Sequence, residues 1–233
     1  MILSIFWFKN YYIFSEIKET VKGENTFLFW NVDKQKDFNV KILKEITGHQ
    51  NIETIILVEA YHKTSNFKTE FQNQLIDYNI MYLQSDMIIA SKKNIKSINY
   101  LYYKQNLKLN HIKIGIEDKA KTFAVIDVYA SPLHKKEDAL SKIINYANQN
   151  DVDVILGDFN TPYESIYFEK FKNDYLSFRA YQNGFTATWP YGIPLLELDQ
   201  IWLNDKIKPI KLDKTYFHNS DHAVLIGKFA SDF

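Results

Sequence analysis

The 233-residue sequence contains no cysteine, which excludes disulfide bonds and thiolate metal sites. Any metal ion bound by this chain must therefore have carboxylate, amide or imidazole ligands, which suit hard cations such as Mg²⁺ or Mn²⁺. An excess of one charge is also missing, because Lys plus Arg and Asp plus Glu both number 28. A zero net charge argues against a protein that coats DNA through its overall positive charge.

Long apolar runs, internal repeats and low-complexity linkers are missing as well. Residues 1–8 are apolar but too short to span a bilayer, and they lack the charged leader and cleavage site of a signal peptide. We expect this segment to pack on the domain, with peripheral membrane association through the N-terminus as the alternative. With 46% hydrophobic residues, the chain can build a packed core. The sequence predicts a monomeric, cytoplasmic protein with one domain over residues 1–233, in which residues 1–25 have no assigned role.

The main positive feature of the sequence is a set of short apolar segments that end in polar residues. Residues 154–156 form such a run, followed by Gly157, and Asp158 and Asn160 then appear two positions apart. Because side chains alternate along a strand, these two polar groups are expected to point the same way at the end of a buried strand. The simpler alternative is an Asx-turn in which Asn160 caps the loop to Pro162.

Four further apolar segments carry polar groups at one end. They are residues 27–33 with Asn31 and Asp33, residues 54–59 with Glu59, residues 198–203 with Asp199, and residues 223–226, which Ser220, Asp221 and His222 precede. Any one of these polar groups is readily explained as an N-cap, a turn acid or a solvated loop residue. Five such segments together predict one acidic site, assembled at the rim of a sheet.

Segments with helical spacing lie between the predicted strands. Leu140, Ile143, Ile144 and Ala147 form a one-sided apolar stripe within residues 135–149. Further helices are predicted around Phe38, Ile42, Leu43 and Ile46 and over residues 165–172, and further strands over residues 87–90, 97–103, 108–116 and 122–129. Buried strands interleaved with one-faced helices predict two packed sheets with helices on the outer faces.

In this order the polar segments resemble the endonuclease/exonuclease/phosphatase superfamily of metal-dependent phosphoesterases, which includes deoxyribonuclease-like and apurinic-site endonuclease-like enzymes. The matching elements are residues 30–33, Glu59, residues 157–160, residues 198–201 and residues 220–222. Residues 186–190, Thr-Ala-Thr-Trp-Pro, also resemble small bacterial members of the group. The resemblance implies an α/β fold, a four-layer α/β/β/α sandwich of two mixed β-sheets flanked by helices.

The resemblance also implies a divalent cation site. Glu59 is the best candidate ligand, since it is a lone carboxylate at a strand end. Asn31 and Asp33 would hold or orient the cation or its waters, and Asp221 would bind the cation directly. We expect the metal to be Mg²⁺ or Mn²⁺.

By the same resemblance, Asp158 orients the attacking water and Asn160 contacts the phosphate. Asp199 orients His222, which contacts the scissile phosphate or takes a proton from water. Direct pairing of Asp221 with His222 is not implied, because adjacent side chains on an extended segment face opposite sides.

The phosphate contact at the end of residues 122–129 is the least determined position. The family places a His or a Tyr there, and Tyr129 is favoured over His134, which is expected to be a solvated loop residue. Gln200 departs from the His or Tyr that is common after the acid. The remaining histidines are expected at the surface: His49, His62, His111 and His218.

The predicted activity is Mg²⁺-dependent hydrolysis of phosphodiester bonds, most typical of a nuclease. The alternative is a phosphatase or phosphodiesterase that acts on a small or lipid phosphate, of inositol-phosphate or sphingomyelinase type. A non-catalytic binding module is the third hypothesis, and the complete set of acids with the histidine argues against it. Aromatic residues near the site in sequence would stack on bases or belong to the core: Phe185, Trp189, Tyr191 and Trp202.

Overall fold

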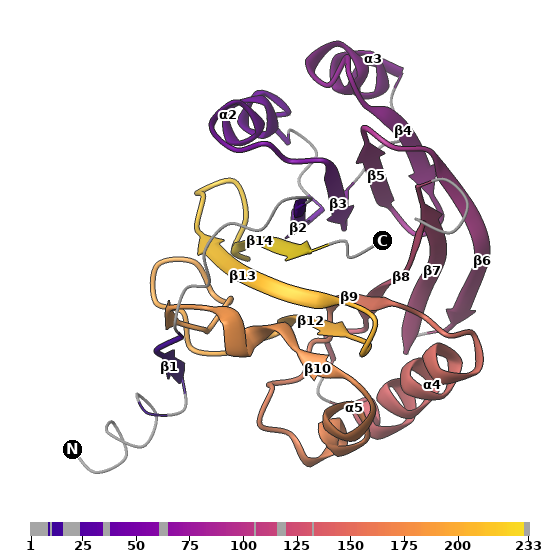
Figure 1. Ribbon diagram of the computed structural model, residues 1–233, viewed down its shortest axis with the longest axis vertical. Helices are drawn as coiled ribbons and strands as arrows, with labels where there is room; N and C mark the ends of the chain where they lie inside the picture. Colours follow the sequence, from indigo (N-terminus) through magenta and orange to yellow (C-terminus); the bar gives the residue numbers. More distant parts are fainter. Residues whose placement is uncertain are drawn as a thin grey trace.

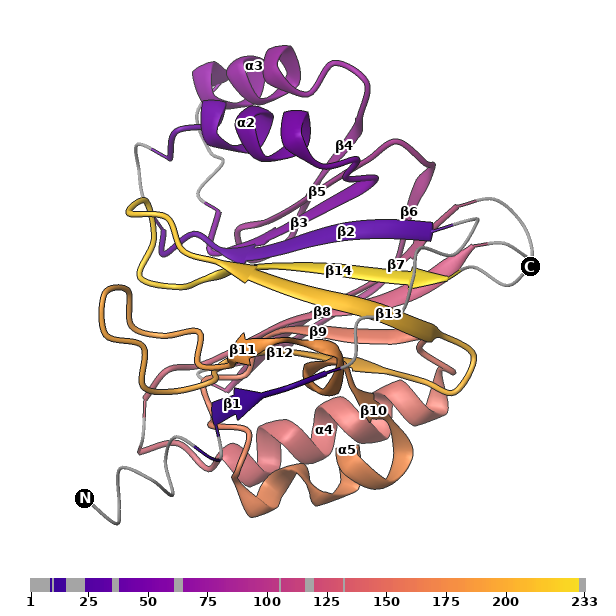
Figure 2. The same cartoon turned by 60° about the vertical axis from the view of Figure 1, so that its left-hand side comes forward.

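The computed structural model describes residues 9, 11–15, 24–34, 38–60, 65–104, 106–115, 120–131 and 133–230. Two six-stranded sheets pack face to face, and helices cover both outer faces (Figures 1 and 2). This arrangement confirms the predicted α/β/β/α sandwich. The apolar segment of residues 1–8 lies outside the described residues.

The first sheet has the strand order β13-β14-β2-β3-β5-β4. Its strands are β2 (Glu24–Asn31), β3 (Thr54–Val58), β4 (Asn79–Leu83), β5 (Met87–Ser91), β13 (Lys208–Thr215) and β14 (Val224–Ala230). β2 and β3 are parallel and the other neighbours are antiparallel, so the sheet is mixed. Every residue of β3 is buried, as the apolar run of residues 55–58 predicts.

The second sheet has the order β10-β12-β9-β8-β7-β6. Its strands are β6 (Ile95–Tyr103), β7 (Leu107–Ile114), β8 (Lys121–Val128), β9 (Val154–Asp158), β10 (Leu176–Ser177) and β12 (Asp199–Leu203). The parallel pair β8 and β9 is joined through helix α4 (Lys136–Gln149). A separate two-stranded sheet pairs β1 (Tyr12–Ile13) with β11 (Gly184–Phe185).

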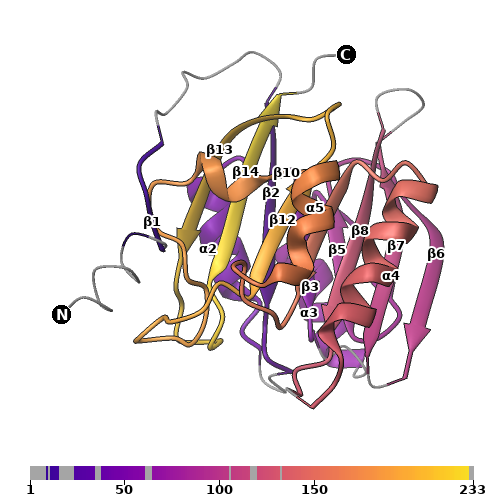
Figure 3. The same ribbon diagram turned by 90° about the horizontal axis from the view of Figure 1, so that it is seen from below.

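Helices α2 (Lys41–His49) and α3 (Ser65–Gln74) cover the first sheet, and α4 and α5 (Glu169–Asp174) cover the second (Figures 2 and 3). The predicted apolar stripe of α4 is buried as expected. The helix predicted over residues 165–172 is divided into a short 3₁₀ helix, η2 (Ile166–Phe168), followed by α5. A second 3₁₀ helix, η3 (Phe178–Tyr181), lies between β10 and β11.

Strand alternation determines which side chains face the other sheet. Phe27 and Phe29 of β2 belong to the core between the sheets, whereas Leu28 and Trp30 pack beneath the helices. Asn31 therefore follows on the inner face. The same alternation carries the inner side chains Val154 and Leu156 on to Asp158 in β9, and in β12 it places Asp199 on the face of Ile201 and Leu203. Polar side chains from both sheets consequently meet at one end of the sandwich.

Gly157 allows β8 to lie close to β9 immediately before Asp158. A Cβ atom at this position would lie 2.1 Å from the Ile126 carbonyl oxygen, and the residue has φ +153°. We expect Gly157→Ala to lower the free energy of unfolding by on the order of 3 kcal/mol, because both the backbone conformation and the contact are unfavourable. Urea unfolding curves measure this directly.

Gly48 is the matched control, since it lies in α2 and a Cβ there has nothing within 4 Å. Gly48→Ala is expected to raise stability by about 0.5–1 kcal/mol. Equal effects of the two changes would contradict the role given to Gly157. Because both sheets contribute to one core, we also expect a single cooperative transition in these curves.

Candidate active site

The predicted polar residues converge where the two sheets meet. In Figure 2 this end lies at the left, where the yellow loop before β14 and the orange loop before β12 extend beyond the strands. At this end, side-chain hydrogen bonds join the two halves of the sandwich: Asn31 Nδ2 donates to Asp158 Oδ2 at 3.0 Å, and His222 Nδ1 lies 2.8 Å from Asp199 Oδ2. Residues distant in the sequence thus form one cluster.

Asp158 is a fully buried carboxylate of the cluster, with 1% of its surface exposed, as is Asp199. Oδ2 accepts hydrogen bonds from the Asn31 amide and from Asn160 Nδ2, and Oδ1 accepts one from the Asn160 backbone N–H. Burial raises the pKa of the Asp158 carboxyl well above its ordinary value, and the positive charge of His222 partly opposes this. The three donors fix the orientation of the carboxylate.

Asn160 supports Asp158 in a way that differs from the expected phosphate contact. Its φ of 43° is in the left-handed region, and the amide Nδ2 donates to Asp158 Oδ2 at 2.8 Å and to the Val128 carbonyl oxygen at 2.9 Å. Both amide hydrogens are therefore occupied, and neither remains for a phosphate oxygen. An Asx-type turn is present, but its accepting side chain is Asp158 and Asn160 supplies the backbone N–H, so it is not the predicted turn in which Asn160 caps the loop.

His222 is held at its ring and at its backbone. Its carbonyl oxygen accepts a hydrogen bond from Trp30 Nε1 at 3.1 Å, and its N–H donates to Ser220 Oγ at 3.0 Å. Burial alone lowers the pKa of the imidazole, but the charge and hydrogen bond of Asp199 outweigh it and raise the pKa to about 10. The second ring nitrogen, Nε2, lies 3.9 Å from Asp158 Oδ2. The predicted pairing of His222 with Asp199 is present.

Asp33, Glu59 and Asp221 form an acidic group beside this buried cluster. Burial raises the pKa of the Asp33 carboxyl, and the negative charges of Asp221 and Glu59 raise it further. Glu59 Oε2 lies 3.0 Å from Lys34 Nζ, so a positive charge already balances this carboxylate. Asp33 and Glu59 both have positive φ values, 50° and 55°, which turn the chain immediately after β2 and β3.

Asp221 and His222 both face the site, although adjacent side chains of an extended segment would face opposite sides. They lie in a bend before β14, which begins only at Val224, so strand alternation does not apply to them. Asp221 Oδ1 is 3.7 Å from His222 Nε2. This distance is too long for a hydrogen bond but places both groups at one point.

Several donor atoms of the cluster suit a divalent cation. Among the described residues, ligand atoms of Asp158, Asp199 and His222 lie within 4.8 Å of one another. Asp199 Oδ1 and Asp221 Oδ1 are buried and have no hydrogen-bond partner in the described part of the chain. Carboxylate oxygens without partners are costly unless a cation or proton satisfies them. Because His222 Nδ1 is engaged by Asp199, the carboxylates of the neighbouring acidic group remain the better cation ligands.

Tyr129 lies directly after β8 at the rim and is 45% exposed. Its ring meets the His134 ring edge to face, with centroids 5.0 Å apart. Gln200 points away from the site, since its Nε2 donates to the Thr161 and Glu197 carbonyl oxygens and its Oε1 accepts from Trp202 Nε1.

The prediction of a surface position is wrong for one histidine. His111 is only 3% exposed, because it lies in β7 under α4, where its Nδ1 is 3.0 Å from the Tyr146 hydroxyl oxygen. His49 and His218 are exposed as expected, and His62 lies outside the described residues.

Ser220 and Lys34 also contribute to the site, in roles that the sequence patterns described above do not predict. Ser220 Oγ donates to the Asn31 carbonyl oxygen at 2.7 Å and so ties the end of β2 to the bend that carries His222. The Ser-Asp-His pattern could have indicated this role. Lys34 directly follows Asp33, but no local pattern indicates that it pairs with Glu59.

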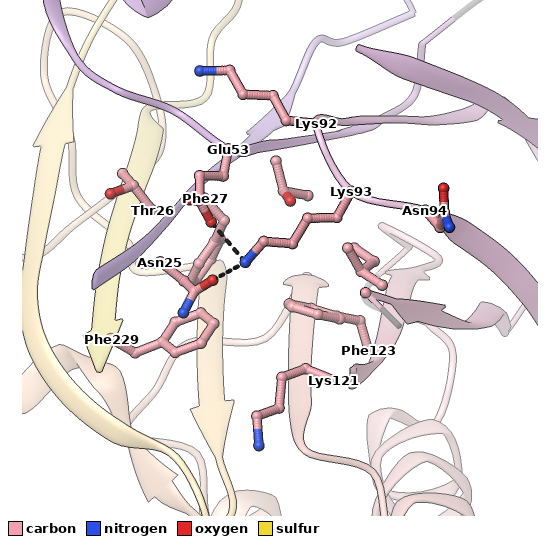
Figure 4. Close-up of a pocket in the computed structure, with 13 residues that line it drawn as sticks. Asn25, Thr26, Phe27, Glu53, Lys92, Lys93, Asn94, Lys121, Phe123 and Phe229 are labelled. Atoms are coloured by element: carbon pink, nitrogen blue, oxygen red, sulfur yellow. Dashed lines mark hydrogen bonds and ion pairs between the residues drawn. The ribbon is translucent and has the colours of Figure 1, made fainter. Parts of the chain in front are cut away.

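A separate cavity of about 390 Å³ lies at the opposite end of the sandwich. Phe27, Phe123 and Phe229 line it, and Figure 4 shows the Lys93 side chain reaching across it toward Glu53 and Asn25. The Lys93 and Glu53 charges are 2.9 Å apart. None of the predicted site residues lines this cavity, so it is not part of the candidate active site.

The sandwich and the buried Asp-Asp-His cluster at its rim define a phosphoesterase of the hydrolase class. The chain belongs to the Endonuclease/Exonuclease/phosphatase family, whose sequence model matches residues 28–222. Members of this family are metal-dependent hydrolases that act on phosphoric ester bonds, and the chain is accordingly an enzyme of this kind. No curated protein matches the sequence.

Solved structures share the fold at low sequence identity. A humanized D. rerio TDP2 is 12% identical with a TM-score of 0.69, over 89% of this chain and 99% of that chain. A family protein from Bacteroides thetaiotaomicron is 10% identical with a TM-score of 0.66, over 90% and 98% of the two chains. The human Nocturnin catalytic domain is 16% identical with a TM-score of 0.63, over 89% and 94%. Among the described residues, no helix is both long and apolar enough to cross a membrane.

Proposed function

We propose that this protein hydrolyses phosphodiester bonds with Mg²⁺ or Mn²⁺ as cofactor, and that its substrate is a nucleic acid. The observation that carries the proposal is the cluster formed across the two sheets. Asp158 is fixed there by three hydrogen-bond donors, and its Oδ2 lies 3.9 Å from Nε2 of a histidine that Asp199 orients. An oriented carboxylate beside an oriented imidazole can position a water and stabilise charge on a phosphate.

In this proposal Glu59, Asp33 and Asp221 hold the cation. The Asn31 amide oxygen, which accepts a hydrogen bond from the Asp33 N–H at 2.9 Å, would help to orient the cation or its waters. A bound cation would neutralise the negative charge of the phosphate. Two observations support this assignment: Asp221 Oδ1 has no hydrogen-bond partner among the described residues, and, besides burial, the closeness of the other two carboxylates raises the pKa of Asp33. Oxygen donors without thiolates favour Mg²⁺ or Mn²⁺.

The catalytic roles follow from which atoms are already engaged. Asp158 would orient the attacking water, and Asn160 and Asn31 would hold Asp158 in position. His222 uses Nδ1 to bind Asp199, so Nε2 is the atom that can donate to the scissile phosphate. Tyr129 would contact the phosphate from the rim through its exposed phenol.

Two observations bear on the substrate. A D. rerio TDP2 of the same fold is known in complex with a single-strand DNA product, which supports a nucleic acid. A lipid phosphodiester is the second candidate, because three large apolar side chains are exposed in the loop after Trp189. Tyr191 is 50% exposed, Ile193 73% and Leu195 47%. Such a loop at the site could contact acyl chains.

A substrate panel tests the proposal. The purified protein is incubated with plasmid, single-stranded DNA, RNA, sphingomyelin and phosphoinositides, each with Mg²⁺ and with EDTA. We expect cleavage of nucleic acid in Mg²⁺ only, and a parallel preparation of Asp158→Ala identifies cleavage by contaminants. Cleavage of lipid alone would favour the second candidate. Absence of hydrolysis of every substrate with Mg²⁺, and again when Mn²⁺ replaces it, would refute the proposed function.

A further inference from the structure

The loop of residues 186–190 joins the parts of the active site that lie in different sheets. The Thr188 hydroxyl oxygen accepts hydrogen bonds from the backbone N–H groups of Leu198 and Asp199, both at 3.1 Å, at the start of β12. The Thr188 carbonyl oxygen accepts one at 2.9 Å from the N–H of Ala223, the residue after His222. One residue thus links the backbones that carry Asp199 and His222.

Trp189, the next residue, reaches the acidic group directly. Its indole Nε1 donates a hydrogen bond to Asp221 Oδ2 at 2.7 Å. An indole has one hydrogen-bond donor and no acceptor, so Trp189 can bind only one oxygen of Asp221 at a time, and this oxygen is Oδ2. The other oxygen, Oδ1, is buried without a hydrogen-bond partner among the described residues and lies 3.7 Å from His222 Nε2.

The backbone of Trp189 is itself held on both sides. Its N–H donates to the Leu196 carbonyl oxygen at 3.0 Å, and its carbonyl oxygen accepts from the N–H groups of Leu195 and Leu196 at 2.8 and 2.9 Å. A ring carried on such a hairpin cannot easily follow Asp221 if the carboxylate rotates. The charge-assisted bond therefore holds Asp221 in one orientation.

We propose that Trp189 is a positioning residue for the metal site, which directs Asp221 Oδ1 toward the cation by binding Oδ2. The inference rests on the proposed function, in which Asp221 is a cation ligand. A hydrogen-bond donor behind a carboxylate ligand orients the ligand, and its loss typically weakens metal affinity by about 10–100-fold. Trp189 itself would not contact the substrate phosphate in this role.

The test measures binding of Mn²⁺ alone by isothermal titration calorimetry. Trp189→Phe removes the N–H and keeps an aromatic ring, and we expect the dissociation constant for Mn²⁺ to rise by about 10-fold or more. Trp202→Phe is the matched control, since it removes an indole that donates to Gln200 Oε1 in the outer core of the second sheet. Trp202→Phe should bind Mn²⁺ like the wild type.

Two further variants separate positioning from packing. Trp189→His is smaller than Trp189→Phe but retains a ring N–H, so it should bind Mn²⁺ more tightly than Trp189→Phe if the donor matters. If the ring only fills space, the order of the two variants is reversed. In an Asp221→Ala background, Trp189→Phe should cause no additional loss, because its partner is already gone.

The outcomes distinguish the inference from the function on which it rests. Failure of the wild type to bind Mn²⁺ would overturn the proposed metal-dependent function. If the wild type and Trp189→Phe bind Mn²⁺ with equal affinity, only the proposed role of Trp189 is overturned. If Trp189→Phe lowers the affinity for Mn²⁺ equally in the wild-type and Asp221→Ala backgrounds, that role is also overturned, because the effect would not depend on the Asp221 carboxylate.

Discussion

Replacing His222 with alanine is expected to lower kcat by on the order of 10²-fold or more. His222 Nε2 faces the space beside Asp158, at 3.9 Å from Oδ2, and can stabilise charge that develops on the phosphate. Such an interaction acts mainly in the transition state, so KM should change much less than kcat. Steady-state kinetics on the substrate identified by the panel measure both parameters.

Asp199→Asn and Asp158→Asn should reduce kcat in the same direction. Asp199→Asn leaves the imidazole present but without the carboxylate that lies 2.8 Å from its Nδ1. Asp158→Asn places an amide where three donors converge, so at least one hydrogen bond to the side chain is lost. His218→Ala is the matched control, because His218 is exposed in the loop shortly before β14. A loss of kcat in His218→Ala as large as in His222→Ala would contradict the assignment.

Removal of the cation is expected to abolish activity, and excess Mg²⁺ should restore it. The acidic group of Asp33, Glu59 and Asp221 favours cation binding, because the cation relieves the repulsion between the three carboxylates. Without the cation, the negative charge of the phosphate would not be neutralised. Glu59→Gln removes one negative charge from this group. We expect it to raise the Mg²⁺ concentration required for half-maximal activity by on the order of 100-fold, given that loss of even an indirect partner costs about 10–100-fold.

Glu53→Gln provides a matched control for Glu59→Gln. Both carboxylates pair with a lysine, Glu59 with Lys34 at 3.0 Å and Glu53 with Lys93 at 2.9 Å, but Glu53 lies at the opposite end of the sandwich. The Mg²⁺ requirement of Glu53→Gln should equal that of the wild type. Undiminished activity in EDTA would exclude the metal mechanism, and an unchanged Mg²⁺ requirement in Glu59→Gln would remove Glu59 from it.

Much of the site could be predicted from local patterns because strand alternation is a local property. Apolar side chains at every second position of β2, β9 and β12 face the other sheet, and the polar residues that continue this alternation are Asn31, Asp158 and Asp199. The helical stripe of α4 was predicted for the same reason. Patterns of this kind need no information about distant parts of the chain.

Strand alternation does not describe positions where the regular pattern ends, and it does not show which strands an outer layer covers. Asp221 and His222 face the same point because β14 begins only at Val224. Asn160 adopts a left-handed conformation after β9, which turns its amide back onto Asp158. His111 is buried because α4 packs over β7, and the sequence of β7 alone does not indicate this cover.

The strands, the main helices and the polar residues that reach the rim could be predicted from the sequence, since they depend on spacing along the chain. Which atoms pair at the rim depends on how the two sheets pack. Asn31 and Asp158 are 127 positions apart, yet their side chains are 3.0 Å apart. Likewise, only packing brings Lys34 to Glu59 and Trp189 to Asp221. A hydrogen bond requires donor and acceptor within about 3 Å at a suitable angle, and the stacking of the two sheets and the path of their loops set that geometry.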